Sequence, residues 1–252
     1  MRHGSASLRL VLLCVTVVAR AAAQQDPKPQ NLPDAPAAKP QDEAAKHQNP
    51  FNATVGVLTK KSIFFPDIAT SAGPLSAKQK FELFADESIA PSRFLSSAAG
   101  AGLGQAQNSL DGYGQGWSGY GKRFGSSMAT AASNNFFETY LISSALHRDP
   151  RYFVTLHGGT GYRIGYALSR IVVARKDDGR NAANWAGMLG PLLAESLATS
   201  YLPVKEQTAG RTFQRYGIRI GLNTASNALR QYWPTIFQKL GVTKIAPGLG
   251  SK

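Results

Sequence analysis

Side chains that could transfer protons gather around one short polar motif near the middle of this 252-residue chain. His147 and Asp149 stand two residues apart, and Glu138 precedes them on what we expect to be the same helix. A positioned imidazole or carboxyl group acts as a general acid or base, and two carboxyl groups cleave glycosidic bonds. We therefore keep Glu138, His147 and Asp149 as candidates for glycan hydrolysis. None of them is assigned as catalytic, because the eleven acidic residues of a basic domain offer such a pair by chance.

The same motif resembles the His-Arg-Asp of a kinase catalytic loop, but the rest of the kinase signature is missing from the sequence. A kinase also needs a Gly-rich phosphate loop, a strand lysine and a metal-binding Asp-Phe-Gly. A structural interpretation fits better: His147 and Arg148 end a helix, where cations face the negative end of the helix dipole. Pro150 stops that helix, because it disfavours helical backbone at the preceding residue. Asp149 would then pair with Arg148 or Arg151.

The sequence indicates neither a metal centre nor a cofactor site. Zinc needs three or four clustered ligands, whereas His147 and His157 lie ten residues apart and the chain has one cysteine. Gly159-Thr160-Gly161 has neither the spacing nor the strand-turn-helix context of a dinucleotide loop. We therefore predict no metal and no cofactor.

A Gly-rich stretch with aromatic and basic residues, at 112–125, is the most distinctive candidate for binding. Exposed aromatic rings stack on sugars, and neighbouring cations pair with anions. The alternative is a connecting loop at 112–121 whose aromatic rings are held in the core. The predicted binding residues, including two from the polar cluster at 147–152, are Tyr113, Trp117, Tyr120, Lys122, Arg123, Arg151 and Tyr152.

The N-terminus predicts where the protein goes. Arg2 and Arg9 precede an apolar run of about ten residues, and Ala21-Ala22-Ala23 provides a cleavage site before Gln24. This is the pattern of a secretory signal peptide over 1–23, and the run is half the length that a membrane anchor needs. Lipidation of Cys14 is the weaker alternative. Cleavage removes the single cysteine, which suits an oxidising compartment.

Three further segments flank the expected domain. Residues 24–50 hold six of the fourteen prolines among Gln, Ala, Asp and Lys, so we predict a disordered tether there. Residues 51–73 carry short apolar patches and predict an extended arm. Residues 241–252, rich in Gly and Pro, predict a flexible tail.

The positive charge identifies the class of partner. The net charge of +13 becomes +10 once the leader is removed, and it lies on the domain, where 22 Lys and Arg face 11 acids. Arg211, Arg215 and Arg219 step by four and predict one solvated basic helix face. Phe213 is expected on the inward face of the same helix. Nucleic acid is not the expected partner of an exported protein. The expected partners are anionic envelope components: glycan, lipopolysaccharide or phospholipid head groups.

The elements that position these residues are predicted to be helices, in a domain spanning 74–240. Apolar residues recur at helical spacing, Ser76 and Gln79 form a capping box, and prolines or Asp-Gly turns separate the segments. The fold class is therefore all-α, a single compact bundle. Its six predicted helices are 76–89, 91–108, 119–146, 161–176, 185–201 and 208–232.

Glycine pairs four residues apart predict how these helices pack. Each interior glycine costs about 1 kcal/mol relative to alanine, so we expect close helix contacts in return. A membrane-inserting helical assembly is the alternative, although no segment has eighteen charge-free apolar residues. The pairs are Gly100/Gly104, Gly121/Gly125, Gly161/Gly165 and Gly217/Gly221.

Several strings resemble a family of exported acidobacterial proteins of unassigned function, over about residues 64–240. They are FFPDIATSAGPLSAKQKFELF (64–84), GYGQGWSGYGKRFG (112–125), HRDPRYF (147–153), GYALSR (165–170) and TAGRTFQRYG with NALRQYWP (208–234). The resemblance implies an exported helical protein, and the family brings no known reaction, ligand or site. Together these observations predict a non-enzymatic binding or structural module of the periplasm or outer cell envelope, with a glycan hydrolase and a membrane-inserting assembly as alternatives.

Overall fold

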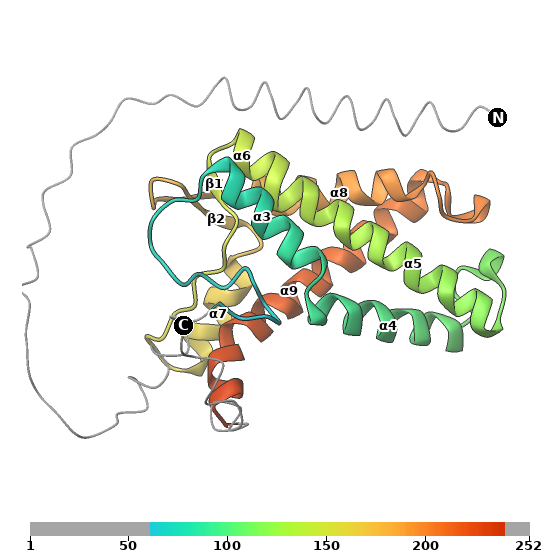
Figure 1. The fold of residues 1–252 in the computed structure, drawn as a ribbon, viewed down its shortest axis with the longest axis horizontal. Coiled ribbons are helices and arrows are strands. Elements are labelled where there is room, and N and C mark those ends of the chain that lie inside the picture. The colour runs from blue at the N-terminus through green and yellow to red at the C-terminus, as the bar shows by residue number, and fades with distance from the viewer. Residues whose placement is uncertain (1–60, 240–252) are drawn as a thin grey trace, which may run out of the picture.

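The computed structural model describes residues 61–239, and helices take up 66% of them. The predicted dominance of helices is confirmed, but the all-α class is wrong in one respect: a small three-stranded sheet closes one end of the domain (Figure 1). The predicted leader, the tether, residues 51–60 of the arm and the tail lie outside the described residues.

The first two helices begin where the sequence predicts. Helix α3 (Ala77–Ser88) starts with the complete capping box, in which the Ser76 side chain accepts from the backbone N–H of Gln79 and the Gln79 side chain accepts from the backbone N–H of Ser76. Helix α4 (Pro91–Ala106) has proline in its first turn, where the missing N–H leaves no bond unmade. Helix α4 packs on α5 (Gly116–Asn135), as Figure 1 shows.

One long continuous helix runs through the centre of the domain. Helix α5 passes directly into the π-helical segment η2 (Phe136–Ile142) and the short helix α6 (Ser143–Ala145). The predicted helix at 119–146 is therefore present. It starts three residues earlier, at Gly116, so half of the predicted loop at 112–121 is helical; only Asp111–Tyr113 (η1) forms a separate turn.

The small apolar core lies where η2 packs on α8 (Trp185–Ala198). Its buried members are Phe137, Ile142, Ala186, Leu193 and Ala194. Gly190 permits this contact, because a Cβ atom there would come within 2.7 Å of the Cβ atom of Glu138. Figure 1 shows α8 running beside α5 for much of its length.

The sheet replaces the second half of the helix predicted at 161–176. Helix α7 (Thr160–Ser169) ends early, and Val173–Lys176 forms strand β2 between β1 (Arg148–Asp149) and β3 (Asn181–Ala183), both antiparallel to it. The turn at 177–179 closes the hairpin, with Gly179 at φ +86°. Because this turn brings β2 back against β3, the backbone groups of Val173 and Arg175 find partners across the ladder rather than along a helix.

The last helix is longer than the sequence predicts. After the turn η3 (Val204–Glu206), helix α9 runs from Ala209 to Lys239 with Pro234 inside it. The predicted end of this helix at residue 232 is wrong. Pro234 is fully buried, and Trp233 packs on the rings of Phe64 and Phe65, so tertiary contacts offset the hydrogen bond that proline removes.

Helix α9 carries its polar residues inward and its apolar residues outward. Arg215, Arg219 and Arg230 keep only 13–21% of their side chains exposed, whereas Phe213 and Leu222 are 58% and 63% exposed. The prediction of a solvated basic face therefore holds for Arg211 alone, and the predicted inward side chain of Phe213 is wrong. In an ordinary surface helix the two faces are reversed.

The predicted glycine contacts are largely wrong. A Cβ atom on Gly100, Gly121, Gly125, or on either member of the 161/165 and 217/221 pairs would meet nothing within 4 Å. Of the eight glycines in the predicted pairs, only Gly104 is tightly enclosed, against Ser109 and Arg123. Spacing identified glycines that share a helix face, but that face points away from the neighbouring helices. Within residues 61–239, no helix combines the length and the hydropathy needed to cross a bilayer.

Candidate functional site

A polar cavity of about 280 Å³ lies between the small sheet, α7 and the inner faces of α5, α8 and α9. Residues from almost every element line it, so the whole fold contributes to its shape. Amides are frequent in the lining, including Asn134, Asn184 and Asn223. The charged residues of the lining are Asp67, Glu87, Arg93, Glu138, Arg148, Asp149, Arg151, Arg170, Arg175 and Arg230.

Two ion pairs neutralise part of this lining. Asp149 accepts from the Nε atom of Arg151 at 2.9 Å and from its Nη2 atom at 2.6 Å, and both side chains are at least 94% buried. Asp67 pairs with Arg230, which also lies 5.7 Å from the ring centre of Phe65. Buried charges with partners of this kind stabilise the fold only as pairs, because losing either partner leaves the other uncompensated.

Arg148 is a buried cation of the cavity wall that has no hydrogen-bonded or ion-paired partner among the residues that the structure describes. It is 3% exposed, and its Nε and Nη1 atoms are buried without a hydrogen bond among residues 61–239. Burial lowers the pKa of its guanidinium, while the more distant Asp177 and Asp178 raise it. Strand β1 holds Arg148 in this position, with its backbone paired across the ladder to Lys176.

Two further arginines of the lining are only partly engaged. Arg170 lies 4.6 Å above the ring centre of Tyr166 and donates to Asn181 at 3.3 Å, while its buried Nε atom has no acceptor among the described residues. Arg175 stacks 4.4 Å above the ring centre of Phe153. Over residues 61–239, the structure shows no hydrogen bond or ion pair to the guanidinium of Arg175. Aromatic faces therefore orient both cations and leave hydrogen-bond donors free.

Two carboxyl groups of the same cavity are driven toward their neutral form. Burial raises the pKa of Glu87 to about 8, and repulsion from Asp67 adds to the effect, although Arg93 opposes it. Burial likewise raises the pKa of Glu138, against the hydrogen bond that Asn134 donates to it at 3.0 Å. At neutral pH the cavity therefore has fewer negative charges than its composition suggests.

The structure separates the three candidates for acid–base chemistry. Glu138 and Asp149 both line the cavity, but Asp149 is held by Arg151. His147 points outward with 83% of its side chain exposed, at φ +50°, and its nearest acid is Asp177 at 4.0 Å. The predicted pairing of Asp149 with Arg151 is present, whereas Arg148 turns into the protein instead of capping a helix.

The aromatic-Gly stretch does not form one binding surface in the structure. Trp117 is 90% exposed and Lys122 is exposed, while Tyr113 and Tyr120 are half-buried and bond to backbone carbonyls. Arg123 is 3% exposed and donates to the carbonyl groups of residues 109, 110 and 114 and to a glutamine side chain. Arg123 therefore ties the loop before α5 to that helix.

The other two predicted binding residues belong to the structure around the cavity. Arg151 donates to the carbonyl groups of Ser71 and Gly73 as well as to Asp149. Tyr152 is buried and donates to Gln231 at 3.2 Å, and burial raises its pKa. Both residues fasten the segment after β1 to its neighbours.

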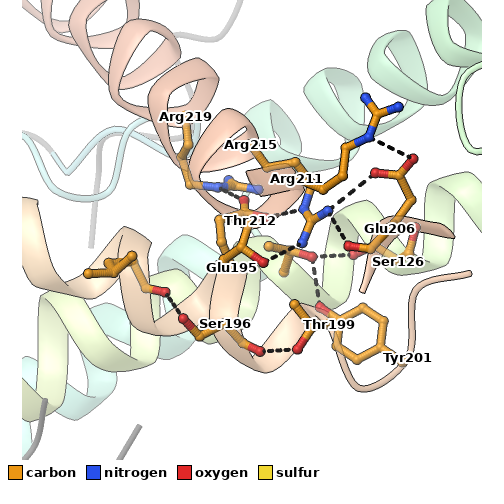
Figure 2. A network of polar contacts seen from close by, with 12 residues as sticks. Ser126, Glu195, Ser196, Thr199, Tyr201, Glu206, Arg211, Thr212, Arg215 and Arg219 are labelled. Carbon is orange, nitrogen blue, oxygen red and sulfur yellow. Dashed lines mark hydrogen bonds and ion pairs between the residues drawn. The ribbon is translucent and has the colours of Figure 1, made fainter. Parts of the chain in front are cut away.

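A second polar cluster lies between α8 and α9 and contrasts with the cavity. Figure 2 shows Glu195 of α8 facing Arg215 and Arg219 of α9. The Nε atom of Arg219 lies 2.6 Å from Oε1 of Glu195, and the Nε atom of Arg215 lies 3.1 Å from Oε2. Arg215 also reaches Glu206 at 3.3 Å. In this cluster every carboxylate has a cationic partner.

Comparisons with known proteins add no assignment. No protein-family model, curated protein or solved structure matches the chain. Within residues 61–239, no three side chains of His, Cys, Asp or Glu come together as a metal site would require. The site must therefore be interpreted from its own geometry.

Sequence reasoning missed the residues that distinguish this cavity. Glu87 and Asn134 are not among the predicted site residues, and Arg148 is predicted to end a helix. One signal was available: Val172 and Val173, β-branched residues before an Asp-Gly turn, favour a strand. A hairpin there would have placed Arg148 beside it, inside the fold.

Proposed function

We propose that this protein is an exported, non-enzymatic binding module of the cell envelope that holds an anionic group in the polar cavity. One observation carries the proposal: Arg148 is buried in the cavity wall with two guanidinium nitrogens unpaired. A buried cation without a partner destabilises a fold, and an anionic ligand removes that penalty. The attraction is strengthened by Arg170 and Arg175, whose donors are also incompletely used.

Isothermal titration calorimetry of the full chain with inorganic phosphate tests this function. The Arg148→Gln variant should bind phosphate about 10- to 100-fold more weakly, the loss expected for charge-assisted hydrogen bonds. Arg180→Gln is the matched control, because Arg180 pairs with Asp178 on the surface at 73% exposure. Equal affinity of both variants and the parent, or no binding by the parent, would overturn the proposal.

The proposed location depends on the leader at 1–23 and on the basic domain. Fractionation of cells followed by salt washing of the membranes tests this part. We expect the mature chain to lack residues 1–23 and to leave the membranes as the salt concentration rises, because screening weakens surface attraction. A full-length protein that stays in the cytoplasm would contradict export.

A membrane-inserting assembly is a second candidate, favoured by the outward apolar face of α9. Phe213, Ile218, Leu222 and Leu229 are each more than half exposed on that helix, while its arginines point inward. Protease protection in liposomes separates this candidate from a water-exposed module. Insertion predicts that α9 is protected and that Leu222→Glu abolishes the protection; complete digestion of the parent rejects insertion.

A further inference from the structure

We infer that the ligand of the cavity is a small phosphorylated sugar, bound as a phosphate monoester with free hydroxyl groups. This inference rests on the proposed anion site and goes beyond it by naming the class of ligand. Three properties of the cavity support it: the excess of cations, unpaired hydrogen-bond acceptors in the same lining, and the size of the space.

The excess of cations fits a doubly charged group. After Arg151 and Arg230 are matched with Asp149 and Asp67, four arginines of the lining face two carboxyl groups. The excess is therefore two positive charges even with both carboxyl groups ionised, and the raised pKa of Glu87 makes it larger at neutral pH. A phosphate monoester carries nearly two negative charges at this pH, and guanidinium groups match its oxygen geometry.

The unpaired acceptors indicate that the same ligand also carries hydroxyl groups. Asn134 is 4% exposed, and its Oδ1 atom is buried without a partner while its amide nitrogen donates to Glu138. Asn223 also lines the cavity, and within residues 61–239 its side chain makes no hydrogen bond. A phosphate ion has few protons to give these oxygens. Sugar hydroxyl groups donate and accept, so they can satisfy amides that phosphate leaves unmatched.

The volume sets the size of the ligand. About 280 Å³ is at the lower end of small-molecule sites, which suits one sugar ring with its phosphate and excludes a folded polymer. Arg148 and Arg175 would meet the phosphate, and Asn134 and Asn223 the hydroxyl groups.

Calorimetric titrations with four probes test this inference: glucose 6-phosphate, glucose, inorganic phosphate and glycerophosphoinositol. We expect glucose 6-phosphate to bind about tenfold or more tightly than inorganic phosphate, and glucose alone not to bind. Glycerophosphoinositol is a soluble lipid head group with a phosphodiester, and it should bind more weakly than the monoester because it carries one negative charge. Equal or tighter binding of the head group would overturn the monoester and assign the site to a lipid source.

Two variants locate the hydroxyl groups. Asn134→Leu should leave the affinity for inorganic phosphate unchanged and reduce the preference for glucose 6-phosphate to about threefold or less. Asn223→Leu changes a half-exposed residue without a partner, so it keeps the test open if Asn134→Leu does not fold. If phosphate and glucose 6-phosphate bind the parent equally, the sugar is wrong while the anion site stands. If neither binds, the proposed function fails as well.

Discussion

The cavity and the α8–α9 cluster are built from the same residue types, and they differ in whether each arginine has a carboxylate. In the α8–α9 cluster, Glu195 serves Arg215 and Arg219 together, and the result is a closed network (Figure 2). In the cavity, Arg148 has no such partner within the described part of the chain, and Glu87 is driven toward its neutral form. The comparison separates charge used for stability from charge left available for a ligand.

The two regions therefore predict opposite responses to the loss of a charge. Removing one member of a closed network leaves buried charges unmatched, which is strongly destabilising. Removing a buried cation that already lacks a partner should stabilise the fold without ligand, because burying that charge costs free energy. Stability measurements on single variants can distinguish these cases, and they need no ligand.

The largest effect is expected at Glu195, which is 3% exposed and faces two arginines. Glu195→Gln keeps the shape but removes the charge, so the free energy of unfolding should fall by about 3–5 kcal/mol. Urea denaturation followed by circular dichroism measures the change. Asp178→Asn, which breaks an exposed pair with Arg180, is the control and should cost less than about 1 kcal/mol. A small loss of stability in Glu195→Gln would mean that the closed network contributes little to the free energy of unfolding.

Arg148→Gln should have the opposite sign. Without ligand, the free energy of unfolding should rise by about 1–2 kcal/mol, because the substitution removes a buried charge and its two unpaired nitrogens. The same urea titration applies, with Arg151→Gln as the paired cation for comparison. Arg151→Gln should destabilise, since it strands the buried Asp149. If both substitutions destabilise alike, Arg148 is a structural residue and the contrast between the regions disappears.

The pH dependence of stability sharpens the description of the cavity. Because the folded-state pKa of Glu87 is raised to about 8 from an ordinary value near 4.5, the folded protein holds a proton that the unfolded chain has lost. The contribution of this group is complete below about pH 4.5 and is lost as the pH rises toward about 8, by about 1 kcal/mol between pH 6 and 7.

Glu87→Gln mimics the protonated form and tests that dependence. The variant should show a flatter stability profile between pH 5 and 8, and near pH 8 it should equal or exceed the parent in stability. Thermal unfolding at several pH values in one ionic strength provides the measurement. An unchanged profile would show that Glu87 is ionised in the folded protein.

The smallest effect is expected at the rim of the closed network. Arg211 is 53% exposed at its side chain, and its Nε atom lies 3.9 Å from Glu206. Arg211→Gln should change the free energy of unfolding by less than about 1 kcal/mol, and high salt should reduce the difference further. A large loss would extend the closed network to its exposed edge.

Helix positions could be predicted from the sequence because capping residues and turn residues act locally. Ser76 with Gln79 marked the start of α3, and Pro91 marked α4. The directions of the helix faces could not be predicted in this way. On α9 the usual pattern predicts Phe213 inside and Arg215 outside. In the structure Arg215 lies inside, because it pairs with Glu195 of another helix, and Phe213 is exposed.

The cavity could be predicted only in part, because long-range partners also decide which side chains point into it. Glu138 and Asp149 could be predicted as site residues because they lie in or near a polar motif, and both line the cavity. Arg148 is functional in our proposal because no carboxylate among residues 61–239 pairs with its guanidinium, and a missing partner leaves no trace in the sequence. The hairpin that encloses it depends on β3, a three-residue strand too short to show a pattern.

The inverted faces of α9 have a consequence for the heat capacity of unfolding. Apolar surface newly exposed to water raises this heat capacity, and newly exposed polar surface lowers it. Here much of the apolar surface, such as that of Ile218 and Leu222, is already exposed in the folded state, while buried Gln231 and Glu195 add polar surface on unfolding. The heat-capacity change should therefore fall below the usual value of about 12–15 cal/mol/K per residue, giving a broad, shallow curve of stability against temperature.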